Sequence, residues 1–192
     1  MSPRKAPPAP TLPTAIRTSQ EARLGDGIEY ATFAAGCFWG VEHMFNKHYS
    51  HLPNWSCVSG YTGGQIGNPN YQQVCSGATG HAESVRIGYQ KGAVGYGELV
   101  EFFYRTHDPT SLNRQGPDSG TQYRSTIFYH SPEQKQIAEQ VTLEVKEKYY
   151  PRQNIATQIV PAGEWFDAEA YHQKYLDNNP GGYECPTHQF YW

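Results

Sequence analysis

The 192-residue sequence predicts an α+β fold, a split β-α-β (ferredoxin-like) sandwich with an appended helix, a strand and an irregular C-terminal tail. Three observations lead to this prediction. Apolar residues alternate with polar ones where strands are expected and recur every three or four positions where helices are expected. From residue 28 onwards these patterns follow the order β-α-β-β-α-β. The length and the 38% hydrophobic content suit one buried core, so we expect a single folded domain over residues 28–192.

The expected sandwich combines four strands with two helices. The strands cover residues 28–35, 55–61, 83–89 and 123–129, and the helices cover residues 37–49 and 98–105. Two stretches, residues 62–71 and 107–122, are too rich in Gly, Asn and Pro for regular structure. Loops of this length in a compact domain usually carry function, and both can close over the first strand-to-helix turn.

A third helix and a fifth strand are expected after the sandwich. Ser131 can cap the helix, and Gln134, three residues later, completes a capping box. Apolar residues spaced by four continue the helix until Pro151 ends it. A short strand over residues 155–160 follows.

The C-terminal part is expected to hold one more helix and then an irregular tail. Asp167 can cap this helix, which carries Tyr171 and Tyr175. A turn-forming stretch of Asn, Pro and Gly over residues 178–182 ends the helix. The irregular tail that follows contains Cys185.

The first 27 residues predict a disordered N-terminal tail. They contain five prolines, four basic residues, no acidic residue before Glu21 and few apolar residues. A mitochondrial transit peptide is the alternative, but the prolines disfavour the amphipathic helix that such a segment needs. We therefore expect a cytoplasmic protein, with a mitochondrial location as the alternative.

Charge and composition exclude several classes of function. The net charge is −3 and no block of Lys or Arg follows the first residues, so neither a nucleic acid nor an anionic membrane is an expected partner. No apolar run approaches the roughly 20 residues of a membrane-spanning helix. The four cysteines form no CxxC pair, so no metal site is expected. We expect a monomer.

Cys37 is the first candidate for chemistry. The strand over residues 28–35 delivers it to the first turn of a helix, where free backbone N–H groups and the helix dipole favour an anion. This position predicts a thiolate, which is the nucleophilic form. Phe38 and Trp39 can wall an apolar pocket, and Gly36 and Gly40 let backbone and substrate approach closely. Alternatively, Cys37 is a small buried residue in a packed turn.

Three further side chains at strand and loop ends suit a reaction at Cys37. Glu83, in an aromatic pocket, is expected to keep its proton near neutral pH because desolvation disfavours the charged carboxylate. The phenols of Tyr61 and Tyr123 can hydrogen-bond to an oxygen atom of a substrate. Each of the three can instead be an ordinary residue at the end of a strand.

Five motifs in order resemble the peptide methionine sulfoxide reductases of the A type. The resemblance covers residues 31–185, most of the expected domain. The motifs are Gly36-Cys37-Phe38-Trp39-Gly40, Gly60-Tyr61-Thr62-Gly63-Gly64, Gly80-His81-Ala82-Glu83, the stretch from Gln115 to Ser125 that includes Asp118 and Tyr123, and Tyr171-His172-Gln173-Lys174-Tyr175-Leu176.

The resemblance implies an enzyme, a peptide-methionine (S)-S-oxide reductase, and a role for each matching residue. Cys37 is then the nucleophile, and Phe38 and Trp39 hold the S-methyl group of the substrate. The sulfoxide oxygen is handled by Glu83 together with Tyr61 and Tyr123, while Asp118 helps to order the site. Cys185 matches the cysteine that recycles the enzyme.

The implied chemistry needs thiols and no metal or organic cofactor. Cys37 becomes a sulfenic acid as methionine leaves, and Cys185 condenses with it to a disulfide. Thioredoxin or another dithiol then reduces this disulfide by exchange. The substrates are oxidised proteins or peptides and free methionine sulfoxide, and the role is protein repair after oxidative damage.

The tail holds only one cysteine, which excludes a three-thiol relay through a second tail cysteine. We expect Cys57 and Cys75 to be dispensable, with Cys75 the less secure of the two because it lies in the approach to Glu83.

Two other classes of function remain open from the residues alone. A Cys-His hydrolase or acyltransferase would use Cys37 with His81 or His107 as its base. A non-catalytic binding module with an aromatic pocket would not need the thiol of Cys37 at all. Reduction of a sulfoxide coupled to thioredoxin separates these alternatives from a reductase.

Overall fold

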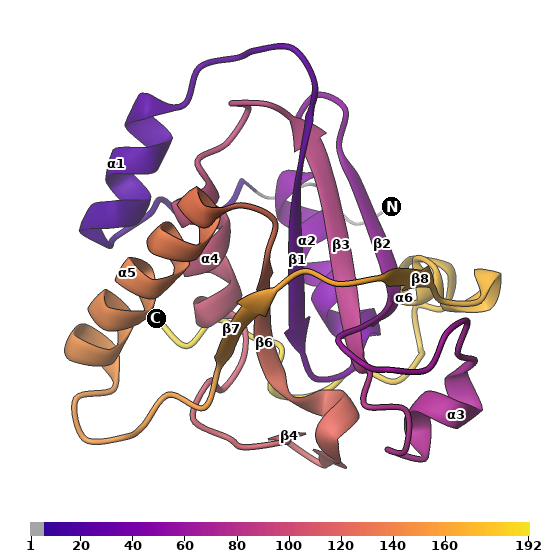
Figure 1. Cartoon of the computed structure of the whole chain (residues 1–192). Helices are drawn as coiled ribbons and strands as arrows, with labels where there is room; N and C mark the ends of the chain where they lie inside the picture. Colours follow the sequence, from indigo (N-terminus) through magenta and orange to yellow (C-terminus); the bar gives the residue numbers. More distant parts are fainter. Residues whose placement is uncertain (1–5) are drawn as a thin grey trace.

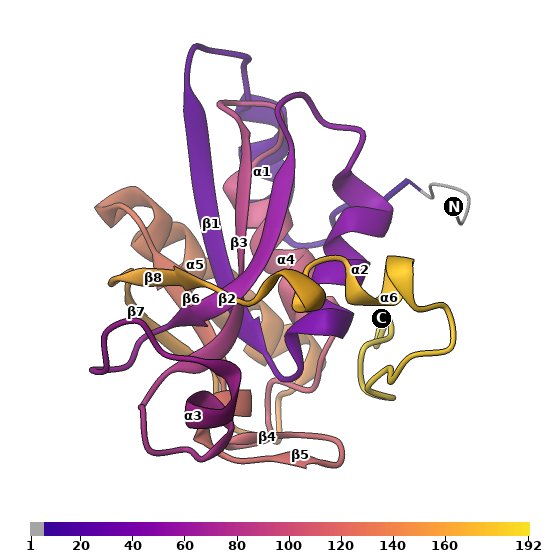
Figure 2. The ribbon, with the colours of Figure 1, turned by 90° about the vertical axis from the view of Figure 1, so that its right-hand side faces the viewer.

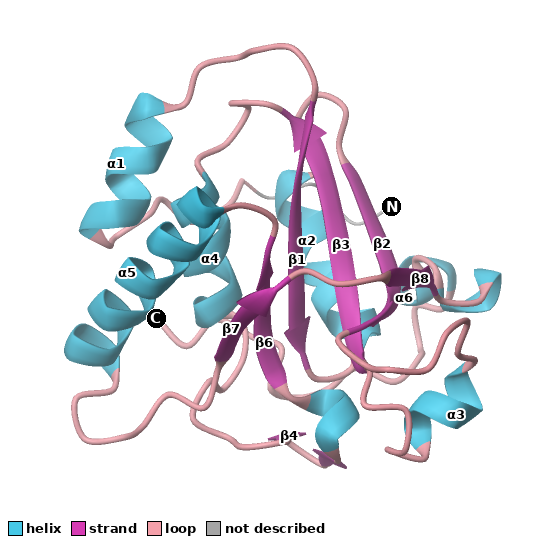
Figure 3. Ribbon diagram, in the orientation of Figure 1, coloured by secondary structure: helices cyan, strands magenta, loops and turns pink. Residues whose placement is uncertain are grey.

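The structure is a computed structural model that describes residues 6–192. Its centre is a six-stranded sheet in the order β7-β6-β1-β3-β2-β8 (Figures 1 and 3). All neighbouring pairs are antiparallel except β6 and β7, which are parallel. The strands are β1 (Ile28–Ala35), β2 (Ser56–Thr62), β3 (Ala82–Gln90), β6 (Ser125–Tyr129), β7 (Gln158–Pro161) and β8 (Trp165–Asp167).

The middle of this sheet confirms the predicted fold class. The order β6-β1-β3-β2 is the one produced by two β-α-β units that interleave, and α2 (Phe38–Tyr49) and α4 (Tyr96–Arg105) are their crossover helices. Both helices cover the same face, because the ring of Phe33 on β1 stacks at 5.5 Å on Phe45 of α2 and at 5.1 Å on Phe103 of α4. Figure 2 shows this layering from the side.

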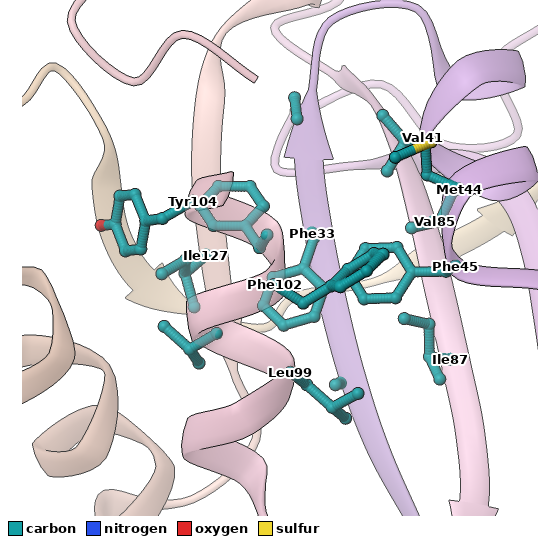
Figure 4. Close-up of a cluster of buried hydrophobic side chains, with 14 of the residues drawn as sticks. Phe33, Val41, Met44, Phe45, Val85, Ile87, Leu99, Phe102, Tyr104 and Ile127 are labelled. Carbon is teal, nitrogen blue, oxygen red and sulfur yellow. The ribbon is translucent and has the colours of Figure 1, made fainter. Parts of the chain in front are cut away.

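The core lies between the sheet and these two helices. Alternate residues on one face of the strands meet residues that recur every three to four positions on the helices. Figure 4 shows Phe33 of β1 and Val85 and Ile87 of β3 against Phe45 and Phe102, all of them buried. This packing fixes the register of β1, whose last residue precedes the Cys37 turn by two positions.

The other elements surround this sandwich. α5 (Pro132–Tyr149) has the predicted cap, since the hydroxyl of Ser131 accepts a hydrogen bond from the backbone N–H of Gln134 at 3.1 Å. The capping box is not completed, because the Gln134 side chain accepts from the backbone N–H of His130 at 2.9 Å and not from that of Ser131. The remaining elements are α1 (Pro13–Glu21), α3 (Tyr71–Cys75), α6 (Tyr175–Asn178), the short strands β4 (Arg114–Gln115) and β5 (Asp118–Ser119), and the 3₁₀ turns η1 (Thr121–Tyr123) and η2 (Ala170–His172). No helix among residues 6–192 is long and apolar enough to cross a membrane.

The N-terminal segment differs from the predicted tail. Residues 1–5 lie outside the described residues, but α1 packs against α4 and α5 and its flanking Leu12 is fully buried. Glu101 of α4 accepts hydrogen bonds from the backbone N–H groups of Thr11 and Leu12 at 2.8 and 3.0 Å. Glu144 of α5 accepts one from the hydroxyl of Thr14 at 2.6 Å. Partners distant in sequence therefore order a segment whose own composition indicates disorder.

The predicted last helix is wrong in its extent. Asp167 does not cap a helix; it ends β8, which pairs with residues 60–62 of β2. Tyr171 then lies in η2 and Tyr175 begins α6, and Lys174 between them has a left-handed backbone with φ of 52°. This break separates the two tyrosines that the sequence pattern joined in one helix.

Candidate functional site

Cys37 lies at the junction of β1 and α2, where the sequence predicted it. Gly36 turns the chain with a φ of 88°, which glycine adopts without strain, and Cys37 is the N-cap residue of α2. Its side chain is buried, with 7% of its surface exposed. Gly36 and Gly40 do not leave space for substrate, contrary to the prediction. The side chain of Gln115 packs on Gly36, and the ring of His188 packs on Gly40.

The free thiol of Cys37 is not the thiolate that its position suggested. Backbone N–H groups of Trp39 and Gly40 lower its pKa, as a helix N-terminus should. Burial and, next, the nearby carboxyl of Glu83 raise the pKa by more, so the net shift is upward. Cys37 is therefore protonated at neutral pH in this structure, because the desolvation of the site exceeds the effect of the helix end.

Glu83 lies beside Cys37, as predicted, and holds a proton near neutral pH. Burial raises the pKa of this carboxyl to about 8, against the lowering effect of a hydrogen bond from the backbone N–H of Phe38. That bond joins Phe38 N to Oε2 of Glu83 at 3.1 Å. The other oxygen, Oε1, is buried and accepts no hydrogen bond from the described residues. An oxygen of a buried neutral acid is thus left for a further partner.

The two predicted tyrosines differ in what their hydroxyls do. The hydroxyl of Tyr61 donates to Oε2 of Glu169 at 2.8 Å, so its single proton is engaged. The hydroxyl of Tyr123 contacts the thiol of Cys75, and the carboxyl of Glu83 is close enough to raise the pKa of Tyr123. Both phenols keep their protons, because burial raises the pKa of each.

Phe38 and Trp39 form the predicted aromatic wall. The ring of Phe38 lies 5.8 Å from the ring of Tyr61, and Trp39 stacks on Tyr175 at 3.7 Å. The indole N–H of Trp39 donates to Nδ1 of His172 at 2.9 Å, which fixes the orientation of the indole.

Three residues of this wall were not assigned a role from the sequence. Glu169 holds both the Tyr61 hydroxyl and the backbone N–H of Tyr71, and the ring of His172 lies between Trp39 and Tyr71. The motif from Tyr171 to Leu176 was the available signal for His172, although no function followed from it. Glu169 and Tyr71 stood outside the quoted motifs.

Asp118 contacts the tail that carries Cys185. The carboxyl of Asp118 on β5 accepts a hydrogen bond from the hydroxyl of Tyr183 at 3.0 Å, two residues before Cys185. Cys185 is buried at 1% exposure, and all four cysteines are free thiols. Its Sγ lies 3.8 Å from the carbonyl oxygen of Gln115, whose side chain packs on Gly36. The tail thus returns Cys185 to the surroundings of the Cys37 turn.

The other two cysteines occupy different environments. Cys57 lies on β2 in the core, as expected for a buried structural residue. Cys75 ends α3, half-buried, and its thiol contacts the hydroxyls of Tyr71 and Tyr123. Cys75 is therefore closer to the candidate site than its position in the sequence indicated.

The two histidines that a hydrolase would use are engaged elsewhere. His81 holds the loop before α3 through two hydrogen bonds. Its ring accepts one from the backbone N–H of Gly64 at 3.1 Å and donates one to the carbonyl of Ile66 at 2.7 Å. His107 donates to the carbonyl of Phe103 and bonds to the hydroxyl of Ser125, both at 2.7 Å. Its burial lowers its pKa to about 4. Neither ring is arranged as a base for Cys37.

Within residues 6–192 no three side chains of His, Cys, Asp or Glu are grouped to hold a metal ion. The reactive groups of the site are a thiol, a neutral carboxylic acid and phenols.

Comparison with known proteins agrees with this geometry. A family described as peptide methionine sulfoxide reductase matches residues 29–190. The chain belongs to this family. It is 51% identical over 152 residues to the peptide methionine sulfoxide reductase MsrA of Methanothermobacter thermautotrophicus, covering 79% of this chain and 88% of that one. The resemblance stated from the sequence motifs is confirmed, and the chain is an oxidoreductase.

Solved structures of Mxr1 from Saccharomyces cerevisiae have the same fold. The reduced form is 42% identical, with a TM-score of 0.80 over 85% of this chain and 92% of that one. A crystal structure of Mxr1 in complex with Trx2 also matches, with 28% identity and a TM-score of 0.58 over 85% of this chain and 89% of that one.

Proposed function

We propose that this chain reduces the S epimer of methionine sulfoxide, in oxidised proteins and peptides and as the free amino acid, to methionine. The nucleophile is Cys37 and the acid is Glu83. The observation that carries the assignment is the hydrogen bond from Phe38 N to Glu83 Oε2, because it fixes a buried, protonated carboxyl one residue from the thiol. This is the arrangement that a reaction between a thiol and a sulfoxide needs.

The first step transfers oxygen from the substrate to Cys37. Glu83 gives its proton to the sulfoxide oxygen, which makes the sulfur more electrophilic, and the sulfur of Cys37 attacks. The attack joins the two sulfur atoms. The S–O bond of the substrate then breaks as the oxygen moves to Cys37 and an S–O bond forms there, the S–S bond breaks, and methionine leaves. The proton of the thiol returns to Glu83, so the products are methionine and Cys37 sulfenic acid, with every atom and electron accounted for.

The aromatic wall and the hydroxyls select and hold the substrate. The rings of Phe38 and Trp39 offer an apolar surface that suits the S-methyl group of methionine sulfoxide. Tyr123 supplies a hydrogen bond to the sulfoxide oxygen beside Glu83. Tyr61 contributes its ring to the wall, since its proton is committed to Glu169, and Asp118 orders the tail through Tyr183.

The second step forms a disulfide that a dithiol reduces. Cys185, held near the Cys37 turn, condenses with the sulfenic acid, and water leaves. Thioredoxin, the kind of partner that the structure of Mxr1 with Trx2 contains, then reduces the disulfide by thiol exchange. Repair of oxidised methionine in proteins is the role that this cycle supports.

The test is a single turnover without reductant on each separate epimer of methionine sulfoxide. We expect about one equivalent of methionine per enzyme from the S epimer and none from the R epimer, because one enzyme per epimer is the rule for this chemistry. Cys37→Ser should form no methionine, since a serine hydroxyl is a poor nucleophile toward sulfur. Methionine formation by that variant contradicts the proposal.

A further inference from the structure

His188 occupies the side of the Cys37 turn and is absent from the proposed chemistry. The residue is 6% exposed, and its Nε2 donates a hydrogen bond to the carbonyl of Ala35, two residues before Cys37, at 2.8 Å. The ring fills the space that glycine leaves in the helix, because a Cβ atom on Gly40 would lie only 1.9 Å from Nδ1 of His188. The ring and the turn therefore fit each other closely.

The same histidine is tied to Cys185. The backbone N–H of His188 donates to the carbonyl of Cys185 at 3.0 Å, which closes a tight turn over residues 185–188. The sulfur of Cys185 in turn lies against the carbonyl of Gln115, and the Gln115 side chain packs on Gly36. His188 and Gln115 thus connect the tail thiol to both glycines that flank Cys37.

Few residues on the N-terminal side of Cys185 are buried, although the exposed Tyr183 also donates a hydrogen bond to Asp118. Between residues 173 and 187 only Cys185 is buried, and residues 177–181 are exposed. A flexible connection reduces the effective concentration of one thiol at another, whereas an anchor close to the thiol raises it. His188 is the buried residue on the C-terminal side of Cys185 that reaches the Cys37 turn.

We propose that His188 is a positioning residue for disulfide formation, which holds the tail against the Cys37 turn so that Cys185 reaches the sulfenic acid. The inference rests on the proposed function. In the step concerned, the S–O bond of Cys37 sulfenic acid breaks and an S–S bond to Cys185 forms. The proton of the Cys185 thiol leaves with the hydroxyl group as water. His188 takes no part in the earlier oxygen transfer.

The test separates the two steps in His188→Ala. In a single turnover with methionine S-sulfoxide, methionine formation should proceed at the wild-type rate. Formation of the Cys37–Cys185 disulfide should slow by at least about tenfold, because the tail loses its anchor. Dimedone should then trap a Cys37 sulfenic acid that wild-type enzyme consumes. The methionine burst also reports that the variant is folded.

Two further variants show whether contact with the turn is the cause. His188→Gln keeps an N–H donor in reach of the Ala35 carbonyl and should recover much of the rate of disulfide formation. Gly40→Ala should slow the same step by displacing the His188 ring, and should add little in the His188→Ala background, where the methyl group has room. Additive effects of the two substitutions would contradict the proposed contact.

A matched control tests whether truncation of any buried or packed tail residue slows disulfide formation. Phe190 packs on His48 and Phe102, away from the Cys37 turn, so Phe190→Ala should leave disulfide formation close to wild type. The inference is overturned if His188→Ala forms the disulfide at the wild-type rate, or if its methionine formation slows as much as its disulfide formation. It is also overturned if Phe190→Ala forms the disulfide as slowly as His188→Ala. Absence of methionine from wild-type enzyme would instead refute the proposed function.

Discussion

The backbone N–H of Phe38 donates a hydrogen bond to the buried carboxyl of Glu83 at 3.1 Å, which links the acid of β3 to the first turn of α2. Strand pairing brings Phe38 and Glu83 close together, because β1 ends at the Cys37 turn and pairs with β3, which carries Glu83. The sheet therefore brings the acid and the thiol together although 46 positions separate them (83 minus 37). Burial of the carboxyl then keeps it protonated.

Glu83→Gln is expected to slow methionine formation in a single turnover by about 100- to 10,000-fold, the usual loss when a positioned acid is removed. The amide still accepts from Phe38 but has no acidic proton to give. Glu83→Asp should be milder, since it remains an acid. A glutamine variant as fast as wild type would make Glu83 an ordinary buried residue of the strand.

The pH dependence gives a second test of Glu83. Its pKa of about 8 lies above the usual value, so the acid is protonated below pH 8 and ionised above it. The single-turnover rate of wild type should fall as the pH rises through about 8, because the ionised carboxylate has no proton to donate to the sulfoxide oxygen. This fall should be missing in Glu83→Gln, which does not titrate. The same fall in both proteins would assign it to another group.

Tyr123→Phe should lower the single-turnover rate of methionine formation more than Tyr61→Phe does, although the sequence suggested equal roles for the two tyrosines. Loss of a positioned hydrogen bond to a developing oxygen charge typically lowers the rate by about 100- to 1,000-fold, and we expect a rate loss of this size for Tyr123→Phe. The Tyr61 hydroxyl already donates to Glu169, so its removal should reduce the rate by less than about tenfold. Single-turnover rates of both variants decide the matter, and the reverse order would show that Tyr61 releases Glu169 when substrate binds.

Cys57→Ala and Cys75→Ala are expected to keep thioredoxin-coupled turnover within a few-fold of wild type. Cys57 is fixed in the core strand β2. Cys75 lies near the site, but its thiol is held by two tyrosine hydroxyls at the end of a helix rather than in a flexible tail. A loss of turnover in Cys75→Ala as large as that in Cys185→Ser would identify Cys75 as the thiol that recycles Cys37.

Leu12→Ala should lower the free energy of unfolding by about 2–5 kcal/mol, as is typical when a fully buried leucine is truncated. Leu12 is fully buried beside α1, in the segment that the sequence marked as disordered. Urea unfolding measures the effect, and Leu24→Ala, at a residue 70% exposed, is the matched control. Equal stability of the two variants would show that α1 is not docked in solution.

The sequence predicted the sandwich because its signals are local. The apolar run in β1 and the spacing of Leu99 and Phe102 in α4 follow from how each element is buried, and the cap of Ser131 lies three residues from its partner. The docking of α1 could not be predicted in this way. It depends on the Glu101 and Glu144 carboxyls, about 90 and 130 residues further along the chain.

The candidate site likewise has features that the local sequence reveals and features that depend on distant parts of the chain. Residue types and motifs identified Cys37 and Glu83, because their chemistry is visible in the sequence. The protonation of the Cys37 thiol was not visible, since the helix end and the burial act in opposite directions and only the folded chain shows which is larger. The partner of Tyr61 was equally hidden, because Glu169 reaches it from a segment 108 residues away.

The most direct test of the account is peptide mapping of the thiols after one turnover on methionine S-sulfoxide without reductant. The account predicts a disulfide between Cys37 and Cys185, with Cys57 and Cys75 still reduced. In Cys185→Ser it predicts the same single equivalent of methionine and a Cys37 sulfenic acid that dimedone traps. A Cys37 that remains a free, unoxidised thiol after methionine has formed, or a disulfide between Cys37 and Cys75, would contradict it.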